Sequence, residues 1–214
     1  MDIAVVTGAH PFDVRSFQDS VVSATRARCY VQGLYEFGAE PTRVRQSYDA
    51  VVFYHWHLDV PAKAPDVWWK AGTREAIESL GTGQGLVLLH HSIVAFPGWD
   101  TWDSLCGFSE RTFDYHQDQL IDAHVVDPAH PVTHEMSDFR ILDETYSMRS
   151  PNPSKVTPLL STSHEQSMTT LAWAHHVQQS RVVCLQLGHG PSAFTNPGFR
   201  RLLGNGVRWV AGLC

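Results

Sequence analysis

The sequence lacks several features that would assign it at once to a class of protein. It has no run of about 18 consecutive apolar residues, which a membrane-spanning helix needs, and no basic segment precedes its first short apolar run. Its 16 Lys and Arg residues are outnumbered by 22 Asp and Glu residues, so the formal net charge is −6. Nucleic-acid phosphates are bound by clustered cationic side chains. We therefore expect a cytoplasmic protein that binds neither nucleic acid nor membranes.

Cysteine is also scarce, and its spacing excludes two kinds of site. The four cysteines form no C-x-x-C pair, which argues against a zinc knuckle, a thioredoxin-like redox motif and a disulfide scaffold. A reducing compartment suits such a chain. Its 214 residues, 43% of them hydrophobic, can bury one sizeable core. We expect a single domain that spans residues 1–214.

Short apolar segments alternate with segments of helical periodicity, which predicts an α/β fold. The first half suggests strands at 3–7, 48–54 and 86–89, with helices over 16–38, 66–80 and 99–105. The second half suggests strands at 121–126 and 139–142, a hairpin of 169–177 with 181–187, and a helix that Asn196 caps. This order predicts a mainly parallel, flavodoxin-like sheet with helices on both faces and an antiparallel insertion in the second half.

Histidine, with 13 residues, is the unusual feature of the composition. Histidines or carboxylates follow five predicted strands, and the carboxyl ends of parallel strands meet at one edge of an open sheet, where ligands bind. We therefore expect an imidazole-rich rim. The groups at these ends are His10, His55 with His57, His90 with His91, Glu144 after Asp143, and His189.

Imidazoles with a carboxylate are the ligands that Zn²⁺ and other first-row divalent ions take in proteins. No H-E-x-x-H motif fixes two histidines on one helix, so each imidazole could instead be hydrogen-bonded separately in its own loop. Side chains alternate along a strand, so His90 and His91 are not both expected to face one pocket. We favour His91, which falls where strand becomes loop. The roles of His55, His57 and His90 stay open.

Several segments, taken together and in order, carry a resemblance to a known family. They are GLVLLHHS, the HPV…DFRILDETY passage over 130–146, Leu-Ala-Trp at 171–173, Gly188-His189, and the ending NPGFRRLLGNGVRWVAG. Over nearly its whole length the chain resembles the ThuA-like (trehalose utilisation) family of the class I glutamine amidotransferase-like superfamily. The resemblance implies a flavodoxin-type fold and a role in the metabolism of trehalose or related disaccharides, including their 3-keto derivatives.

The chain departs from the related glutaminases at two positions. Their nucleophilic cysteine lies at a strand-to-helix elbow, and here that segment reads Leu89-His90-His91-Ser92. Their catalytic histidine precedes a carboxylate by two residues, whereas His189 is followed by Gly190-Pro191. Without a thiolate the thioester route is closed, so the protein is not expected to be a glutaminase unless Ser92 takes the place of the cysteine.

The combined hypothesis is a metal-assisted isomerase, lyase or hydrolase reaction on a small carbohydrate. Zinc is the expected ion, with manganese or iron as alternatives, and its predicted ligands are His10, His91, Glu144 and His189. As catalytic residues we predict His91 and His189, as ligands or proton carriers, and Glu144, as ligand or general base. Asp143 is expected to orient a neighbour and Tyr146 to donate a hydrogen bond to substrate.

Apolar side chains near these strand ends are candidates for stacking on a sugar ring, namely Phe12, Trp56, Trp99 and Trp102. A competing hypothesis is a non-catalytic scaffold that binds a sugar or another metabolite and has lost the amidotransferase nucleophile. A third, a protein-interaction domain, would need a large exposed apolar patch. We also expect a homodimer, although no segment specifies its interface.

Overall fold

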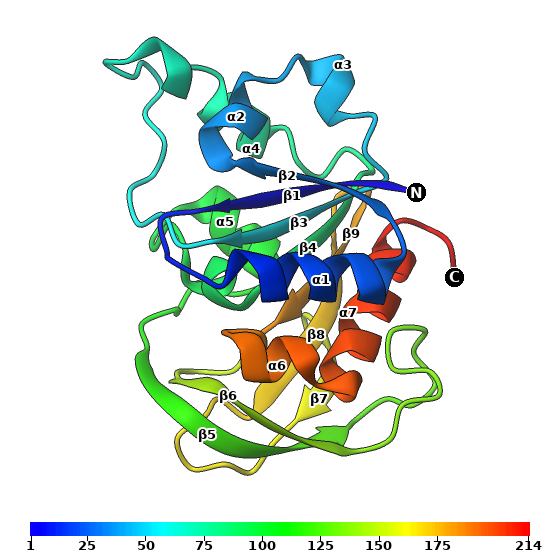
Figure 1. Ribbon diagram of the computed structural model, residues 1–214. Helices are drawn as coiled ribbons and strands as arrows, with labels where there is room; N and C mark the ends of the chain where they lie inside the picture. Colours follow the sequence, from blue (N-terminus) through cyan, green and yellow to red (C-terminus); the bar gives the residue numbers. More distant parts are fainter.

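The chain forms a nine-stranded sheet in the order β2-β1-β3-β4-β9-β8-β7-β5-β6, and the computed structural model describes residues 1–214 (Figure 1). The parallel half consists of β1 (Asp2–Gly8), β2 (Arg28–Gly33), β3 (Ala50–His55), β4 (Gly85–Leu89) and β9 (Ser180–Leu185). The antiparallel half consists of β5 (Asp114–Val125), β6 (Phe139–Ser147), β7 (Thr157–Ser161) and β8 (Thr170–Val177). The predicted fold class is confirmed.

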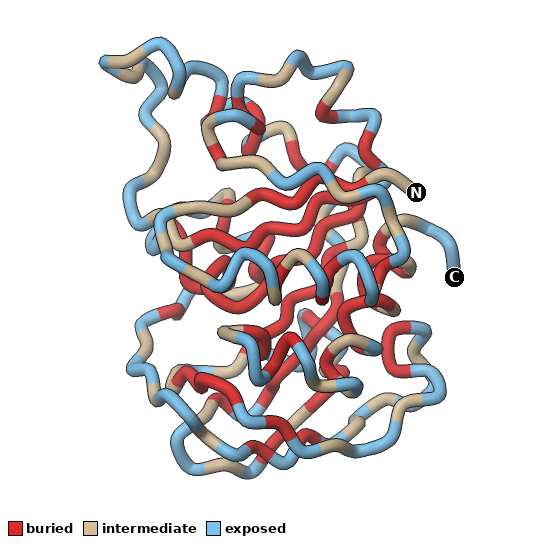
Figure 2. Tube along the Cα trace, viewed as in Figure 1, coloured by how far each residue is buried: buried red, intermediate tan, exposed pale blue.

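Helices cover both faces of the parallel half, so its central strands are buried throughout (Figure 2). One face of the sheet is covered by α1 (Val14–Thr25), α6 (Pro191–Thr195) and α7 (Pro197–Val210). The remaining helices are α2 (Leu34–Ala39), α3 (Thr42–Arg45), α4 (Thr73–Glu78) and α5 (Asp100–Cys106). Two short 3₁₀ turns complete the chain, η1 (Trp68–Lys70) and η2 (His90–Val94). Alternate side chains of β1 enter different cores, Ile3 with α1 and α7 and Ala4 with α2, α4 and α5. No helix is both long and apolar enough to cross a bilayer.

The single helix predicted over residues 16–38 is wrong. Helix α1 starts after Asp13, whose carboxylate accepts the Ser16 amide, and it ends at Arg26, which adopts a left-handed conformation with φ of 54°. The following segment pairs with β1 as the edge strand β2. Its β-favouring residue Val31 matched the helical period by chance, and pairing with β1 decides between the two structures.

The helix predicted over residues 66–80 is also too long, since α4 covers only Thr73–Glu78. Gly72 precedes it with φ of 83°, which a regular helix cannot continue through. The ends of β4, the helix α5, the β8–β9 hairpin and the helix α7 lie close to their predicted positions. Asn196 caps α7 as expected, because its side chain accepts the amides of Gly198 and Phe199.

Strands β5 and β6 are longer than the sequence pattern indicates, and this difference affects the site. The strand predicted over residues 121–126, whose alternation of apolar and polar residues suggests a half-exposed edge strand, lies within β5 except for its last residue. Strand β5 has β7 on one side and β6 on the other, so the edge strand is β6. Strand β6 continues to Ser147, so Glu144 lies within the strand and not beyond its end. Glu144 nevertheless reaches the rim, because its carboxylate lies 3.3 Å from Nε2 of His90 and 3.7 Å from Nε2 of His189.

Candidate functional site

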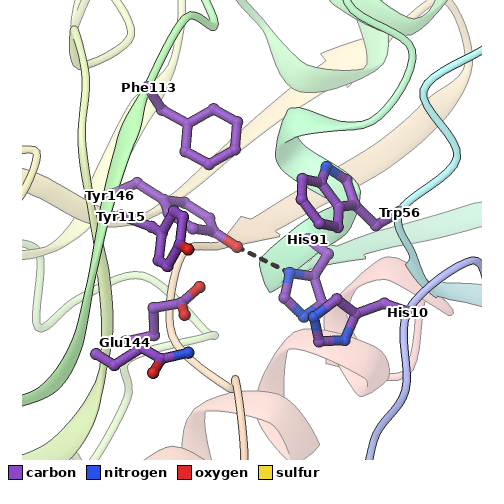
Figure 3. Close-up of a pocket in the computed structure, with 8 residues that line it drawn as sticks. His10, Trp56, His91, Phe113, Tyr115, Glu144 and Tyr146 are labelled. Atoms are coloured by element: carbon purple, nitrogen blue, oxygen red, sulfur yellow. Dashed lines mark hydrogen bonds between the residues drawn. The ribbon is translucent and has the colours of Figure 1, made fainter.

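A cleft of about 420 Å³ opens at the carboxyl ends of the parallel strands, between them and β5–β6 (Figure 3). One wall comes from the loops after β1, β3 and β4, and the other comes from β5 and β6. The lining residues are His10, Trp56, His91, Phe113, Tyr115, Gln117, Glu144 and Tyr146. The cleft therefore combines aromatic rings with imidazole, carboxamide and carboxylate groups.

The turn after β4 brings two neighbouring histidines to this site. His90 has φ of 48°, a left-handed conformation that is uncommon for a residue other than glycine. The chain leaves the strand at this residue and enters η2, so strand alternation no longer applies. Of the two histidines only His91 lines the cleft, as expected, while His90 is fully buried and its Nε2 faces Glu144. A left-handed residue at the turn from a strand into a helix is the geometry of a nucleophile elbow, and here that residue carries an imidazole.

The hydroxyl group of Ser92, the next residue of this turn, forms hydrogen bonds that stabilise the fold. Its Oγ accepts the backbone amide of His55 at 2.9 Å and donates to the His55 carbonyl at 3.2 Å. The side chain is fully buried. It ties η2 to the end of β3 and does not point at the cleft lining.

The tautomer of His90 follows from its two contacts. Its Nδ1 lies 2.5 Å from the carbonyl oxygen of Gln186, which can only accept, so Nδ1 carries a proton and donates it. Its Nε2 faces Oε1 of Glu144 at 3.3 Å. Gln186 in turn donates from Nε2 to the Glu144 carbonyl at 2.8 Å, which couples the end of β9 to β6. A backbone acceptor on one ring nitrogen is the usual way in which proteins orient a metal-binding imidazole.

His91 is held by Tyr146 in a similar way. The two rings are joined by a 3.0 Å contact between His91 Nδ1 and the Tyr146 hydroxyl (Figure 3). Burial is the main reason that the pKa of Tyr146 is well raised, and a hydrogen bond to Glu144 contributes. When Tyr146 donates its hydroxyl proton to Glu144, the Tyr146 oxygen accepts a hydrogen bond from Nδ1–H of His91. The Nε2 atom of His91 is then unprotonated and keeps its lone pair. This Nε2 is buried and has no hydrogen-bond partner. Burial also lowers the pKa of His91 and keeps the ring neutral.

Glu144 lies between three groups that favour its ionised form. Burial alone would raise the pKa of its carboxyl, but hydrogen bonds from His90 and Gln117 and the charges of His90 and His189 outweigh burial and lower it. Its second oxygen, Oε2, is 3.7 Å from Nε2 of His189. The carboxylate is therefore negatively charged near neutral pH and is shared by two imidazoles.

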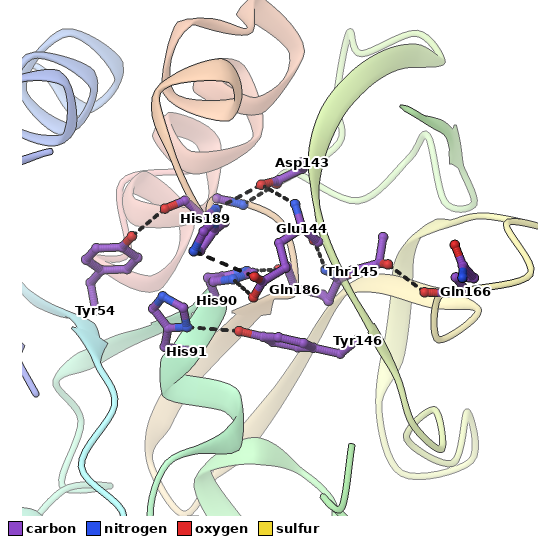
Figure 4. Close-up of polar contacts among 11 residues, drawn as sticks. Tyr54, His90, His91, Asp143, Glu144, Thr145, Tyr146, Gln166, Gln186 and His189 are labelled. Carbon is purple, nitrogen blue, oxygen red and sulfur yellow. Dashed lines mark hydrogen bonds and ion pairs between the residues drawn. The ribbon is translucent and has the colours of Figure 1, made fainter. Parts of the chain in front are cut away.

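Asp143 organises the loop that carries His189 (Figure 4). Its carboxylate accepts the backbone amides of Gly188 at 2.6 Å, His189 at 3.0 Å and Glu144 at 2.9 Å. The carbonyl of His189 accepts the Tyr54 hydroxyl at 2.8 Å. Burial raises the pKa of Asp143, although the three amides oppose this. This residue orients its neighbours and does not line the aromatic cleft.

The predicted site residues meet in space although they are scattered along the sequence. Possible ligand atoms lie within 4.8 Å of one another in two groups, His10 with His91 and His189, and His90 with His91 and Glu144. The rings of His10 and His91 have centroids 3.9 Å apart, and Nδ1 of His10 is buried without a partner. The structure thus brings together all four predicted ligands and adds His90. Their chemical roles stay predictions.

Of the aromatic residues proposed for stacking, only Trp56 lines the cleft. Phe12 packs on Phe17 and Tyr54, while Trp99 and Trp102 pack around Phe96 in the core. The sequence pattern did not identify the lining residues Phe113, Tyr115 and Gln117, nor Gln186. The first three lie on a segment whose strand was predicted too short, so nothing placed them near the rim.

His55 and His57 do not line the cleft. His55 is fully buried at the end of β3 among the rings of Phe53, Phe96 and Trp102, and its Nε2 has no partner. Burial lowers its pKa well below the ordinary value of 6.5. The ring is therefore neutral in the folded protein.

The buried neutral His55 makes the fold sensitive to acid. Below pH 6.5 the unfolded chain binds a proton at this residue and the folded chain does not, so its contribution to stability is full above pH 6.5 and declines as the pH falls. Between pH 6.5 and 5 the loss is about 2 kcal/mol for one such group. We expect urea denaturation of a His55→Phe variant to show a pH-dependent loss smaller by this amount. An equal loss in both proteins would contradict the prediction, and His134→Ala, which changes an exposed histidine, is the control.

Comparison with known proteins identifies relatives of the whole fold. A family model described as ThuA, trehalose utilisation, matches residues 41–210. A ThuA-like protein from Parabacteroides merdae has a TM-score of 0.73 at 17% identity, over 98% of this chain and 89% of that one. No match is found among curated proteins.

Two further structures are similar at lower identity. A GMP synthase protein from Thermoplasma acidophilum has a TM-score of 0.56 at 6% identity, over 99% of this chain and 95% of that one. A cold-adapted β-galactosidase from Rahnella sp. R3 has a TM-score of 0.65 at 11% identity, over 100% of this chain but only 31% of the enzyme. These likenesses show a shared α/β fold of the glutamine amidotransferase type.

Proposed function

Because this chain belongs to the ThuA (trehalose utilisation) family, we propose that its cleft binds a small carbohydrate related to trehalose and that the imidazole–carboxylate cluster performs metal-assisted chemistry on it. The observation that carries this proposal is the convergence of His90, His91 and Glu144 with His10 and His189 at the base of an aromatic cleft. Isomerisation, elimination and hydrolysis are the reaction classes that such a cluster supports.

The aromatic lining supports a sugar as the ligand. Trp56, Phe113 and Tyr115 offer ring surface to the apolar face of a pyranose, while Gln117 and Glu144 offer polar groups to its hydroxyls. A site that combines a few aligned polar groups with aromatic walls suits a small polyhydroxylated molecule. The net charge of −6 also favours a neutral ligand over an anion.

The donor set fits a divalent metal ion. The Nδ1 atoms of His90 and His91 are held by Gln186 and Tyr146. The Nε2 atom of His91 has no partner, and that of His90, which contacts Glu144, would give up its proton when it binds the ion. Lone pairs and a negative charge that meet in this way are stabilised by a cation between them. Imidazole and carboxylate together suit zinc, with manganese and iron as alternatives. Such an ion would polarise a substrate carbonyl or lower the pKa of a bound water.

The protein's own groups would bind, orient and move protons. Glu144, held ionised, is the proposed general base, and His189 beside it is placed to carry the proton onward. Tyr146, whose raised pKa keeps it protonated, would turn its single hydroxyl proton from Glu144 to a substrate oxygen. Asp143 holds the His189 loop in place. We do not propose glutaminase activity, because the elbow residue is His90 and Ser92 is hydrogen-bonded to β3.

The second candidate is a sugar-binding scaffold without catalysis. The observation that favours it is the absence of a cysteine from the elbow where related glutaminases carry their nucleophile. Such a protein would bind the same sugars through the aromatic cleft. It would need neither the ion nor the ionised Glu144, and this difference separates the two candidates.

Metal content tests the proposal directly. Protein purified without chelator and supplied with zinc, manganese or iron is expected to hold about one ion per chain by elemental analysis, and His91→Ala or His189→Ala to lower its affinity for that ion at least 10-fold. His134→Ala changes an exposed histidine and is the matched control. Sugar binding by a metal-free protein that never turns sugar over would favour the scaffold. Retention of the full metal affinity by both cluster variants would refute the ligand assignment.

A further inference from the structure

A second cleft of about 490 Å³ adjoins the aromatic one, and Gln117 and Glu144 line both. The rest of its lining comes from the β5–β6 strands, from the loop between β9 and α6, and from the first turn of α6. These residues are Asp118, Leu142, Asp143, His189, Gly190, Pro191, Ser192 and Ala193. The second cleft contains no phenyl, phenol or indole ring, in contrast to its neighbour. The two clefts thus offer different chemistry on either side of one carboxylate.

The residues shared by the clefts lie at a β-bulge. His116 of β5 pairs with Thr145 of β6, and pairing resumes with Gln119 opposite Asp143. Gln117 and Asp118 therefore stand opposite the single residue Glu144. A bulge of this kind re-aims side chains and is common beside active sites. Here it places two additional polar side chains directly across from Glu144.

The bulge requires a strained backbone at Asp118. This residue has φ of 55°, which a side chain other than glycine adopts at a cost, although aspartate tolerates it better than most residues. The Asp118 side chain is exposed and forms no hydrogen bond or ion pair that would offset the strain of its backbone. The negative charge of Asp118 acts to raise the pKa of His189, which lines the same cleft, although burial lowers that pKa more strongly. Strain at an exposed polar residue beside a reactive cluster is typical of a functional position.

We propose that the second cleft is a subsite for a second sugar unit, and that Asp118 is its specificity-determining residue. This inference rests on the proposed carbohydrate function and names how the substrate lies in the site. One unit stacks in the aromatic cleft, and the other gives its hydroxyl hydrogens to the Asp118 carboxylate and to Ser192 in the polar cleft. The bond between the two units then lies beside Glu144. The substrate class is a carbohydrate of at least two units.

Isothermal titration with trehalose and with glucose tests this arrangement on the protein with its metal bound. The wild type is expected to bind trehalose at least 10-fold more tightly than glucose. Asp118→Gly removes the carboxylate and suits the left-handed backbone, so the variant is expected to fold. It should weaken trehalose binding about 10-fold and leave glucose binding unchanged, because a hydrogen bond to a charged group is lost only at the second unit. Trp56→Ala should weaken the binding of both sugars.

Asp122→Ala is the matched control, because Asp122 lies on the same strand, is exposed and pairs with Arg140 outside both clefts. Equal affinity of the wild type for trehalose and glucose, or an equal effect of Asp118→Gly on both, would overturn the subsite and leave the proposed function standing. Failure of the wild type to bind either sugar would overturn both.

Discussion

Replacing Glu144 by glutamine is expected to lower the turnover of the bound sugar by about 10²- to 10⁴-fold, the usual contribution of a general base. Glutamine keeps the size of the side chain and can still contact His90, but it neither carries charge nor accepts a proton. Glu144 faces His90 and His189 and lines both clefts, so its charge acts at the centre of the site. Steady-state kinetics should show the loss mainly in kcat.

Glu110→Gln is the matched control for this variant, because it removes the same charge from an exposed pair with Arg149. It should leave kcat and KM unchanged. Metal affinity should also fall in Glu144→Gln, since one anionic ligand is lost. Wild-type turnover by Glu144→Gln would exclude Glu144 as the base and would favour an imidazole of the cluster in that role.

Replacing Asp143 by alanine is expected to lower the free energy of unfolding by roughly 3–6 kcal/mol. The change leaves the buried amides of Gly188 and Glu144 and the part-buried amide of His189 without their acceptor. Each orphaned buried donor costs about 1–3 kcal/mol and the part-buried one costs less, so the sum is roughly 3–6 kcal/mol. Urea denaturation at pH 7 would measure the loss as a lower midpoint at an unchanged slope. The His189 loop should also become more mobile, so activity is expected to fall in parallel.

Asp13→Ala provides the contrast for Asp143, because Asp13 also accepts a backbone amide, that of Ser16, but at an exposed helix cap. Its loss should cost only about 1 kcal/mol. Asp143→Asn keeps one acceptor oxygen and should fall between the two. If Asp143→Ala destabilises the protein no more than Asp13→Ala does, the buried carboxylate does not hold the loop.

The fold was largely predictable because its signals are local. Buried parallel strands appear as short apolar runs, and the cap at Asn196 with Pro197 marks the start of α7. The edge strand β2 was missed because its exposed residues carry no strand alternation and its structure depends on pairing with β1. A short segment of mixed propensity is decided by its neighbours in space, which periodicity does not record.

The sequence by itself determined that histidines end several parallel strands, and the geometry of a parallel sheet then requires them to share one rim. Only the tertiary structure decided which of them meet a carboxylate. The left-handed turn at His90 brings its buried imidazole against Glu144, and the pairing of β5 with β6 places the Gln117–Asp118 bulge opposite that carboxylate. Backbone dihedral angles and the register between distant strands fix these positions, and neither can be predicted from the spacing of residues along the chain.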